Sequence, residues 1–260
     1  GFCAFLDENY SNNKLQKILK EYIKKILFLR KRTRYLSKGN YNIFRLQFIL
    51  KTFPTAKIII CCRNPINTAK SLEKVHLRFN EISRRDSMFK KKLTELCHYE
   101  FGPQRKAIFT DQKSFDKIIN SWDKKEDFMG YLFQWLSTYN MVIDNYLNNN
   151  EINKNFFLLD YDEFTNNQKF YLKELFTFCE LEEDENFFKQ KIPIKNNKKI
   201  KDYSNIDNNL SEEVNLTYSY LKNFIKKNYY NSDEKILKIL ISLEVIIHKI
   251  LIISVLVNRS

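Results

Sequence analysis

Residues 57–72 read KIIICCRNPINTAKSL, and this stretch decides the predicted fold class. Ile58 to Cys62 is a continuous run of β-branched and sulfur side chains, which predicts a strand covered on both faces, as in a parallel sheet. The pair Asn64-Pro65 excludes helix at position 64 and sets a turn. Apolar or small residues then recur at helical spacing from position 66 to 72. The stretch therefore predicts a strand, a turn and a helix, an arrangement that presents N–H groups and cations to an anion.

Two polar residues of this stretch could hold that anion. Arg63 directly follows the predicted strand, and Ser71 stands eight residues further on, in the predicted helix. A guanidinium group is a planar, permanently charged fork that matches a phosphate, and a hydroxyl can add a second hydrogen bond. The plainer interpretation is an arginine at the end of a strand and a serine that solvates a helix.

Three segments in sequence order resemble sulfotransferases that use 3′-phosphoadenosine 5′-phosphosulfate. Arg-x-Pro after a strand, with a serine eight residues beyond the arginine, resembles the segment of that family that binds the 3′-phosphate. Upstream, residues 34–60, RYLSKGNYNIFRLQFILKTFPTAKIII, resemble the family's lysine loop, helix and Phe-Pro-x-Ala-Lys approach to the strand. Downstream, residues 156–164, FFLLDYDEF, resemble its strand and Tyr-Glu-Asp-type turn, and a helix ending in FTFCEL follows. Each segment alone is weak, whereas the three together are a fairly specific signal.

The resemblance implies a fold and an activity. The fold would be α/β with three layers, a central parallel sheet flanked by helices, in a P-loop-like sulfotransferase fold truncated at its amino end. We expect one domain over residues 1–260, with a core at about 33–181 and a helical extension at about 210–257. The activity would move a sulfuryl group, without a metal, to a hydroxyl or amine. An anionic carbohydrate is one candidate acceptor.

The resemblance also implies roles for individual residues. Arg63 and Ser71 would bind the 3′-phosphate of the nucleotide, and Tyr161 would lie on the adenine side. Lys38 stands where the family has a lysine close to the transferring group. The plainer interpretations are one more exposed lysine and an aromatic residue that closes a strand end. Asn40 stands where some members have a histidine base, and an amide cannot take that role.

The base must then come from elsewhere. His76 lies five residues beyond Ser71, and His98 and Glu100 lie in a segment broken by Gly-Pro. Each of these three could accept a proton if its pKa is tuned near neutrality. A lone histidine is more often structural, so the three stay alternatives.

One part of the family pattern is missing. The glycines stand at positions 1, 39, 102 and 130, and none lies in a G-x-x-x-x-G-K or similar phosphate loop. We therefore expect this chain to be a fragment or processed form whose phosphosulfate loop lies upstream of Gly1. The alternative is a non-catalytic anion-binding or scaffolding relative that has lost the loop. A nucleotide kinase of related fold is disfavoured because no Walker lysine loop is present.

The amino-acid composition limits which binding partners and which cellular compartment are expected. The net charge of +13 implies an attraction for anions, but Lys, Asn and Ile are abundant throughout the chain. The charge is therefore weak evidence for nucleic acid, and we expect no specific nucleic-acid partner. Five cysteines without ligand spacing predict no disulfide framework and no zinc site, and favour a reducing compartment such as the cytoplasm.

The tail, residues 236–257, is the most apolar part of the chain. Charged residues interrupt it, so its uncharged pieces are shorter than the roughly 20 residues of a membrane-spanning helix. We expect an amphipathic helix docked on the domain. Contact of this helix with a membrane surface is the alternative.

Overall fold

The structure is a computed structural model that describes residues 13–148, 153–182, 187, 206–229 and 253–258. The described residues are mostly helical and include a small sheet with one parallel strand pair, which places the chain in the mixed α/β class. They fall into two compact units, each described here by itself. The helical unit comprises Arg63–Asn145 and Lys198–Ser219, with Gly1–Ala4; the sheet unit comprises Phe5–Cys62, Tyr146–Asn197 and Tyr220–Ser260. The single-domain expectation stays a prediction.

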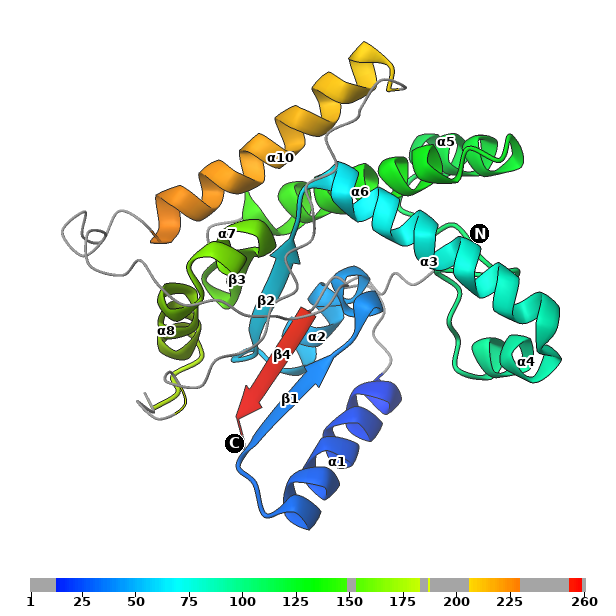
Figure 1. The fold of residues 1–260 in the computed structure, drawn as a ribbon. Coiled ribbons are helices and arrows are strands. Elements are labelled where there is room, and N and C mark those ends of the chain that lie inside the picture. Colours follow the sequence, from blue (N-terminus) through cyan, green and yellow to red (C-terminus); the bar gives the residue numbers. More distant parts are fainter. Residues whose placement is uncertain (1–12, 149–152, 183–186, 188–205, 230–252, 259–260) are drawn as a thin grey trace. The chain divides into compact units, whose positions relative to one another are not determined.

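Four strands form the sheet in the order β1-β4-β2-β3 (Figure 1). Their bounds are Arg34–Lys38 for β1, Lys57–Cys62 for β2, Phe156–Asp160 for β3 and Ile253–Asn258 for β4. β2 and β3 are parallel, with Ile58 opposite Phe156 and Cys62 opposite Asp160. β4 runs antiparallel to both β1 and β2. Among the described residues, the predicted parallel sheet is therefore present only as the β2–β3 pair.

Both faces of the β2–β3 pair are covered, as the apolar run in β2 predicts. All five residues of β3 are buried. On one face Phe157 and Leu159 form a cluster with Phe164 and Tyr171, which come from α7 (Tyr161–Asn166) and α8 (Gln168–Phe178). On the other face the ring of Phe156 lies 5.4 Å from the ring of Tyr146. The pair is thus the apolar centre of the sheet unit.

Four further helices belong to the described part of the sheet unit. They are α1 (Asn13–Arg30), which contacts β1, the 3₁₀ helix η1 (Asn40–Phe44), α2 (Leu46–Thr52) and the 3₁₀ helix η3 (Asn153–Asn155). The sequence pattern favours a strand at 33–36 and helices at 14–29 and 168–178, and β1, α1 and α8 agree with these ranges within two residues. The predicted helix at 42–52 is divided into η1 and α2, because the backbone of Arg45 leaves the helical conformation.

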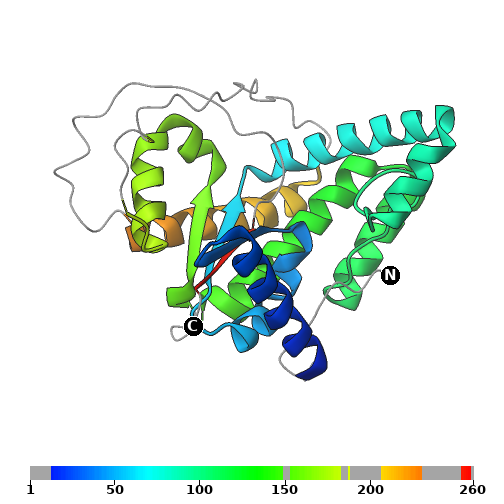
Figure 2. The same ribbon diagram turned by 90° about the horizontal axis from the view of Figure 1, so that it is seen from below.

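The helical unit contains α3 (Pro65–Arg85), α4 (Ser87–Glu95), α5 (Gln112–Asp123) and α6 (Asp127–Val142). A short π-helix, η2 (Ile143–Leu147), begins in this unit and ends in the sheet unit. α10 (Asn208–Tyr229) begins in this unit and ends in the other. Figure 2 shows α3 beside α6, and α6 also packs on α5. The sequence predicted α3 to run to about Phe89. It ends earlier because the Asp86 carboxylate caps α4 by accepting the N–H groups of Met88 and Phe89.

Close approach of α6 to α5 depends on a glycine. A Cβ atom built at Gly130 would lie 2.1 Å from Nε1 of Trp122. Along the rest of α6, large side chains are buried on most of its circumference, including Tyr131, Trp135 and Tyr139. These side chains are therefore core residues of the helical unit.

Four helices end with a non-glycine residue in the left-handed conformation. These residues are Lys31, Cys97, Lys125 and Glu180, with φ between 50° and 63°. At each end the N–H of the following residue bonds back five positions and the N–H of the residue itself bonds back three, as in Arg32 to Leu27 and Lys31 to Phe28. This is the Schellman pattern, whose left-handed position usually holds glycine.

The apolar tail differs from the prediction. Residues 253–257 were expected in a helix and instead belong to β4, which adds to the sheet between β1 and β2. Alternation of β-branched residues in ISVLVN suits a strand. The rest of the predicted helix, 236–252, lies outside the described residues. Among the helices that the structure describes, none combines the length and apolar character needed to cross a bilayer.

Candidate functional site

The predicted strand, turn and helix are confirmed at residues 57–72. β2 ends at Cys62, and α3 begins at Pro65. Asn64 caps α3: its side-chain Oδ1 accepts the N–H of Asn67 at 3.0 Å, and its carbonyl accepts the Thr68 hydroxyl at 2.9 Å. Proline suits the first helical position because it lacks the N–H that would have no partner there. Contacts within a few residues therefore account for the turn.

Arg63 and Ser71 lie at the start of the helical unit. Arg63 occupies the turn before the Asn64 cap, and Ser71 lies six residues beyond Pro65, which is about 9 Å along the helix axis. Both residues are half-buried, so neither is sealed in the core. Shared binding of one phosphate requires the Arg63 side chain to extend along the first two turns of α3.

His76 lies on the opposite side of α3 from a site at Ser71. Five residues correspond to a rotation of about 140° around a helix axis. The imidazole is 6% exposed, its Nδ1 accepts the N–H of Gly102 at 3.1 Å, and its Nε2 lies 2.8 Å from the side-chain amide of Asn80. Burial and the Arg105 charge lower the His76 pKa from 6.5 to about 4. These contacts favour a structural role for His76, which holds the Gly102 loop against α3.

Sequence reasoning missed the charged cluster around His76. Arg105 donates to the Asp127 carboxylate at 2.8 Å, and this carboxylate lies 3.9 Å from Nε2 of His76. The Arg105 guanidinium also stacks 3.9 Å from the Trp122 ring. Tyr131 donates its hydroxyl to the carbonyl of Glu100 at 2.9 Å, and burial raises the pKa of Tyr131 well above its ordinary value. The cluster ties loop 98–109 to α5 and α6.

His98 and Glu100 lie close together at the start of this loop. Nδ1 of His98 is 3.6 Å from the Glu100 carboxylate, which is within ion-pair range but long for a hydrogen bond. The His98 side chain is half exposed, whereas that of Glu100 is mostly covered. Of the three predicted bases, His98 has the solvent access that proton transfer requires, and Glu100 is placed to orient it.

Lys38 and Tyr161 belong to the sheet unit. Lys38 is the last residue of β1 and is exposed, followed by Gly39 and η1. Tyr161 is half-buried and opens α7 at the carboxyl end of β3. Their predicted roles toward a nucleotide stay predictions.

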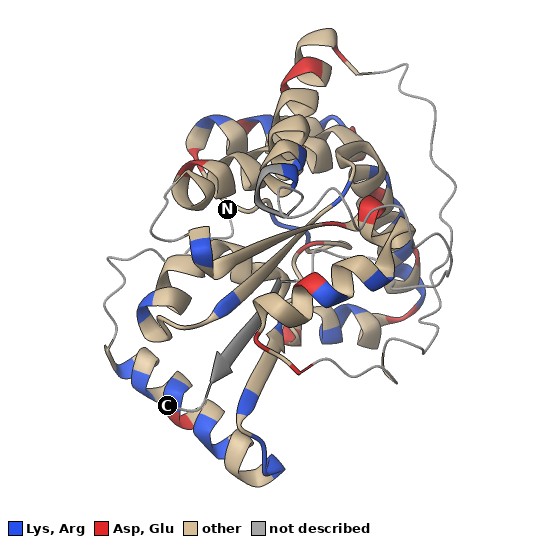
Figure 3. Ribbon diagram, turned by 90° about the vertical axis from the view of Figure 1, so that its left-hand side faces the viewer, with Lys and Arg blue, Asp and Glu red and all other residues tan. Residues whose placement is uncertain are grey.

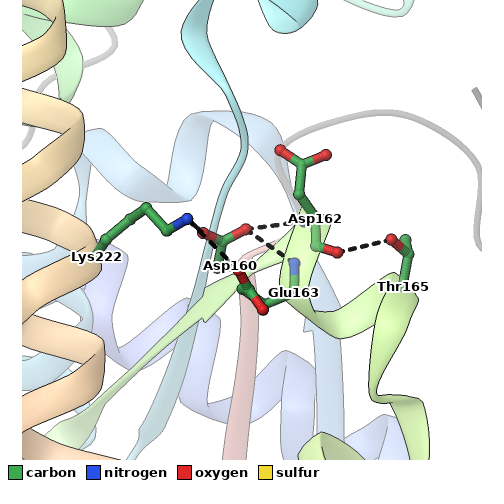
Figure 4. A network of polar contacts seen from close by, with 5 residues as sticks. All are labelled: Asp160, Asp162, Glu163, Thr165 and Lys222. Atoms are coloured by element: carbon green, nitrogen blue, oxygen red, sulfur yellow. Dashed lines mark hydrogen bonds and ion pairs between the residues drawn. The ribbon is translucent and has the colours of Figure 1, made fainter. Parts of the chain in front are cut away.

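The end of β3 carries a polar network that the sequence only partly indicated (Figure 4). Asp160 is the N-cap of α7: its Oδ1 accepts the N–H groups of Asp162 and Glu163 at 2.8 and 3.2 Å. Nζ of Lys222, on α10, lies 3.9 Å from Asp160 and 3.5 Å from Glu163. The backbone amides of Asp162 and Glu163 therefore serve a structural contact with Asp160. The spacing Asp-x-x-Glu resembles a capping box and could have identified Asp160 in advance.

Burial dominates the electrostatics of this network. Asp160 is 1% exposed, and its pKa is raised by burial, while Lys222 and the two amides oppose the rise. Cys62, opposite Asp160 in the β2–β3 register, has a pKa well above its ordinary value because it is buried and faces Asp160. Cys62 therefore remains a thiol and is no nucleophile at neutral pH.

Other described features add no further site. No disulfide joins the described cysteines Cys61, Cys62, Cys97 and Cys179. An open depression on α10, lined by residues between Asn208 and Ser219, contains none of the predicted site residues. Within the described ranges, His, Cys, Asp and Glu side chains form no group of three that could hold a metal ion.

Comparison of the chain with models of protein families, with curated proteins and with solved structures finds no match. The resemblance to sulfotransferases therefore depends on the three segments of this sequence and on the local structure around them.

Proposed function

We propose that this protein is a sulfotransferase that moves a sulfuryl group from 3′-phosphoadenosine 5′-phosphosulfate to a hydroxyl or amine. The observation that carries the proposal is the turn between β2 and α3. Arg63 stands between a buried parallel strand and a capped helix, with Ser71 on the second turn of that helix, and both are accessible. A cation and a hydroxyl at the start of a helix favour a phosphate, since the helix dipole adds to their attraction.

The proposed mechanism needs little covalent help from the protein. Sulfuryl transfer resembles phosphoryl transfer, in which catalysis comes from holding the donor in line and neutralising the leaving phosphate. Arg63 and Ser71 would bind the 3′-phosphate, and Lys38 would approach the transferring group. His98, oriented by Glu100, would take the acceptor proton, because His76 is buried with both ring nitrogens in contact. The three-layer sulfotransferase fold is part of this proposal.

The alternative is a non-catalytic anion-binding relative. Asn40 stands at the place of a family base, and no phosphate loop occurs in residues 1–260. Such a protein would bind the nucleotide or another anion without transfer. In either case the scattered cysteines of the sequence are the reason for proposing a reducing compartment such as the cytoplasm.

The test uses the full-length protein, including any residues encoded upstream of Gly1. It is incubated with 3′-phosphoadenosine 5′-phosphosulfate that carries radiolabelled sulfate and with a panel of phenols, amines and anionic carbohydrates. We expect labelled product with at least one acceptor class and a lower yield for Arg63→Ala. The control is Arg78→Ala, an exposed arginine on the same helix, which leaves the yield unchanged. Nucleotide binding without transfer to any acceptor would favour the alternative, and absence of nucleotide binding would contradict both.

A further inference from the structure

The outward side of α1 carries large apolar side chains that the sheet unit leaves exposed. Tyr22 is 56% exposed and Ile18 54%, while Phe28 and Leu29 reach 73% and 76%. The inward side is separate: Ile23 and Leu27 are buried. Amphipathic packing on the unit therefore accounts for one side of the helix and leaves the apolar residues of the other side unexplained.

These side chains form a stripe. At 100° per residue, Ile18, Tyr22 and Leu29 fall within a sector about 40° wide, and Phe28 lies about 100° from Leu29. The stripe from Ile18 to Leu29 extends about 16 Å along the axis. We call Ile18, Tyr22, Phe28 and Leu29 the α1 stripe.

Basic residues lie within the α1 stripe and beside it. Lys14 and Lys25 fall within about 40° of its centre line, and Lys17 and Lys24 lie about 100° away on one side. The helix NKLQKILKEYIKKILFLR contains six basic residues against one acidic residue, Glu21, and Lys31 and Arg32 follow it. The long stems of these lysines let their ammonium groups reach past the apolar side chains. Figure 3 shows the Lys and Arg positions recurring along α1.

We propose that α1 binds an anionic lipid surface, lying in the interface with the α1 stripe inserted between headgroups and its lysines on the lipid phosphates. An exposed apolar stripe with lysines beside it is the pattern of an interfacial helix. Nucleic acid would use the lysines but would give Ile18 and Leu29 no apolar environment. A second copy of the chain would bring two positively charged helices together. Charge complementarity and the exposed aliphatic residues together thus select an anionic membrane.

Binding is measured by flotation of the full chain with vesicles of phosphatidylcholine alone or with about one third phosphatidylserine. We expect binding to the second composition and a decrease with added salt, since each basic residue near such a surface raises affinity about fivefold. Lys24→Gln with Lys25→Gln should therefore weaken binding about 25-fold. The matched control is Lys91→Gln with Lys92→Gln on α4, two exposed lysines in the helical unit, which should retain it.

A second pair of variants tests insertion. Leu29→Gln should weaken binding about tenfold, because an apolar side chain no longer leaves water, whereas Leu216→Gln, 64% exposed on α10, should not. Both leucines are exposed, so neither change removes a core contact. If Lys91→Gln with Lys92→Gln on α4 weakened vesicle binding as much as Lys24→Gln with Lys25→Gln, the attraction would come from total charge, which would overturn the proposal. Retained binding of Leu29→Gln, or no binding to the anionic vesicles, would overturn it as well.

Discussion

The buried imidazole of His76 should make the helical unit sensitive to mild acid. Its pKa is lowered from 6.5 to about 4, first by burial and then by Arg105, so the folded state excludes the charged form. Between these two values the unfolded chain binds a proton that the folded chain does not, and stability falls as pH falls. A pKa that drops from 6.5 to about 4 corresponds to a loss of about 3 kcal/mol in the free energy of unfolding. This loss is absent above pH 6.5 and complete below pH 4.

The assay combines two measurements. Nuclear magnetic resonance resolves the ring signals of the three histidines, and His76→Asn assigns the one that belongs to His76. Urea unfolding at a series of pH values between 7 and 4 then compares the parent with His76→Asn. Asparagine offers an acceptor to Gly102 but does not titrate, so the stability difference between the two proteins should shift by about 3 kcal/mol in favour of the variant as pH falls. A His76 signal that titrates near 6.5, or parallel pH profiles, would refute the reasoning.

Three further predictions concern stability. Gly130→Ala should cost about 1 to 3 kcal/mol in urea unfolding because its methyl group meets the Trp122 ring, and a variant as stable as the parent would show that α6 can shift. Lys125→Gly should raise stability by about 1 kcal/mol because φ there is 63°, whereas Lys124→Gly, one residue earlier at φ −78°, should not; equal effects would contradict this account. Asp160→Asn should match or exceed the parent at neutral pH, since burial raises the Asp160 pKa and asparagine keeps the capping oxygen. The stability of the parent should rise relative to that of Asp160→Asn as pH falls through the raised pKa of Asp160. Asp160→Ala should be about 1 kcal/mol less stable than the parent because it removes the cap. A large loss of stability for Asp160→Asn at neutral pH would argue against burial as the dominant cause of the raised pKa.

Helices and strands were predicted well where the sequence contains a clear local pattern, such as an apolar run or an Asn-Pro pair. The apolar run of β2 and the Asn64-Pro65 pair determine a strand, a cap and a helix start through contacts within a few residues. Helix ends were harder, because the chain has four glycines and none stands at the left-handed ends. Lys31, Cys97, Lys125 and Glu180 adopt that conformation without the residue type that usually marks it. The end of α3 was misplaced because Asp86 acts as a cap inside a long helical pattern.

Long-range pairings and burial could not be predicted. Residues 253–258 join the sheet by pairing with strands about two hundred positions away, and their apolar run fits a buried helix as well as a strand. The candidate site likewise had features that the local sequence predicts and features that depend on distant contacts. Arg63 and Ser71 could be named from spacing, whereas the burial of His76 depends on Gly102 and Arg105, which come from a distant loop. A histidine five residues beyond Ser71 looked like a base only while its orientation was unknown.

The central claim is that Arg63 binds the 3′-phosphate of a nucleotide, and calorimetry on the full-length protein tests it most directly. The parent and Arg63→Ala are each titrated with 3′-phosphoadenosine 5′-phosphate and with adenosine 5′-phosphate, which lacks the 3′-phosphate. The account predicts that the parent prefers the first nucleotide about tenfold or more and that Arg63→Ala abolishes this preference while the affinity for the second nucleotide is unchanged. A parent that binds both nucleotides equally, or a preference that survives in Arg63→Ala, would contradict it.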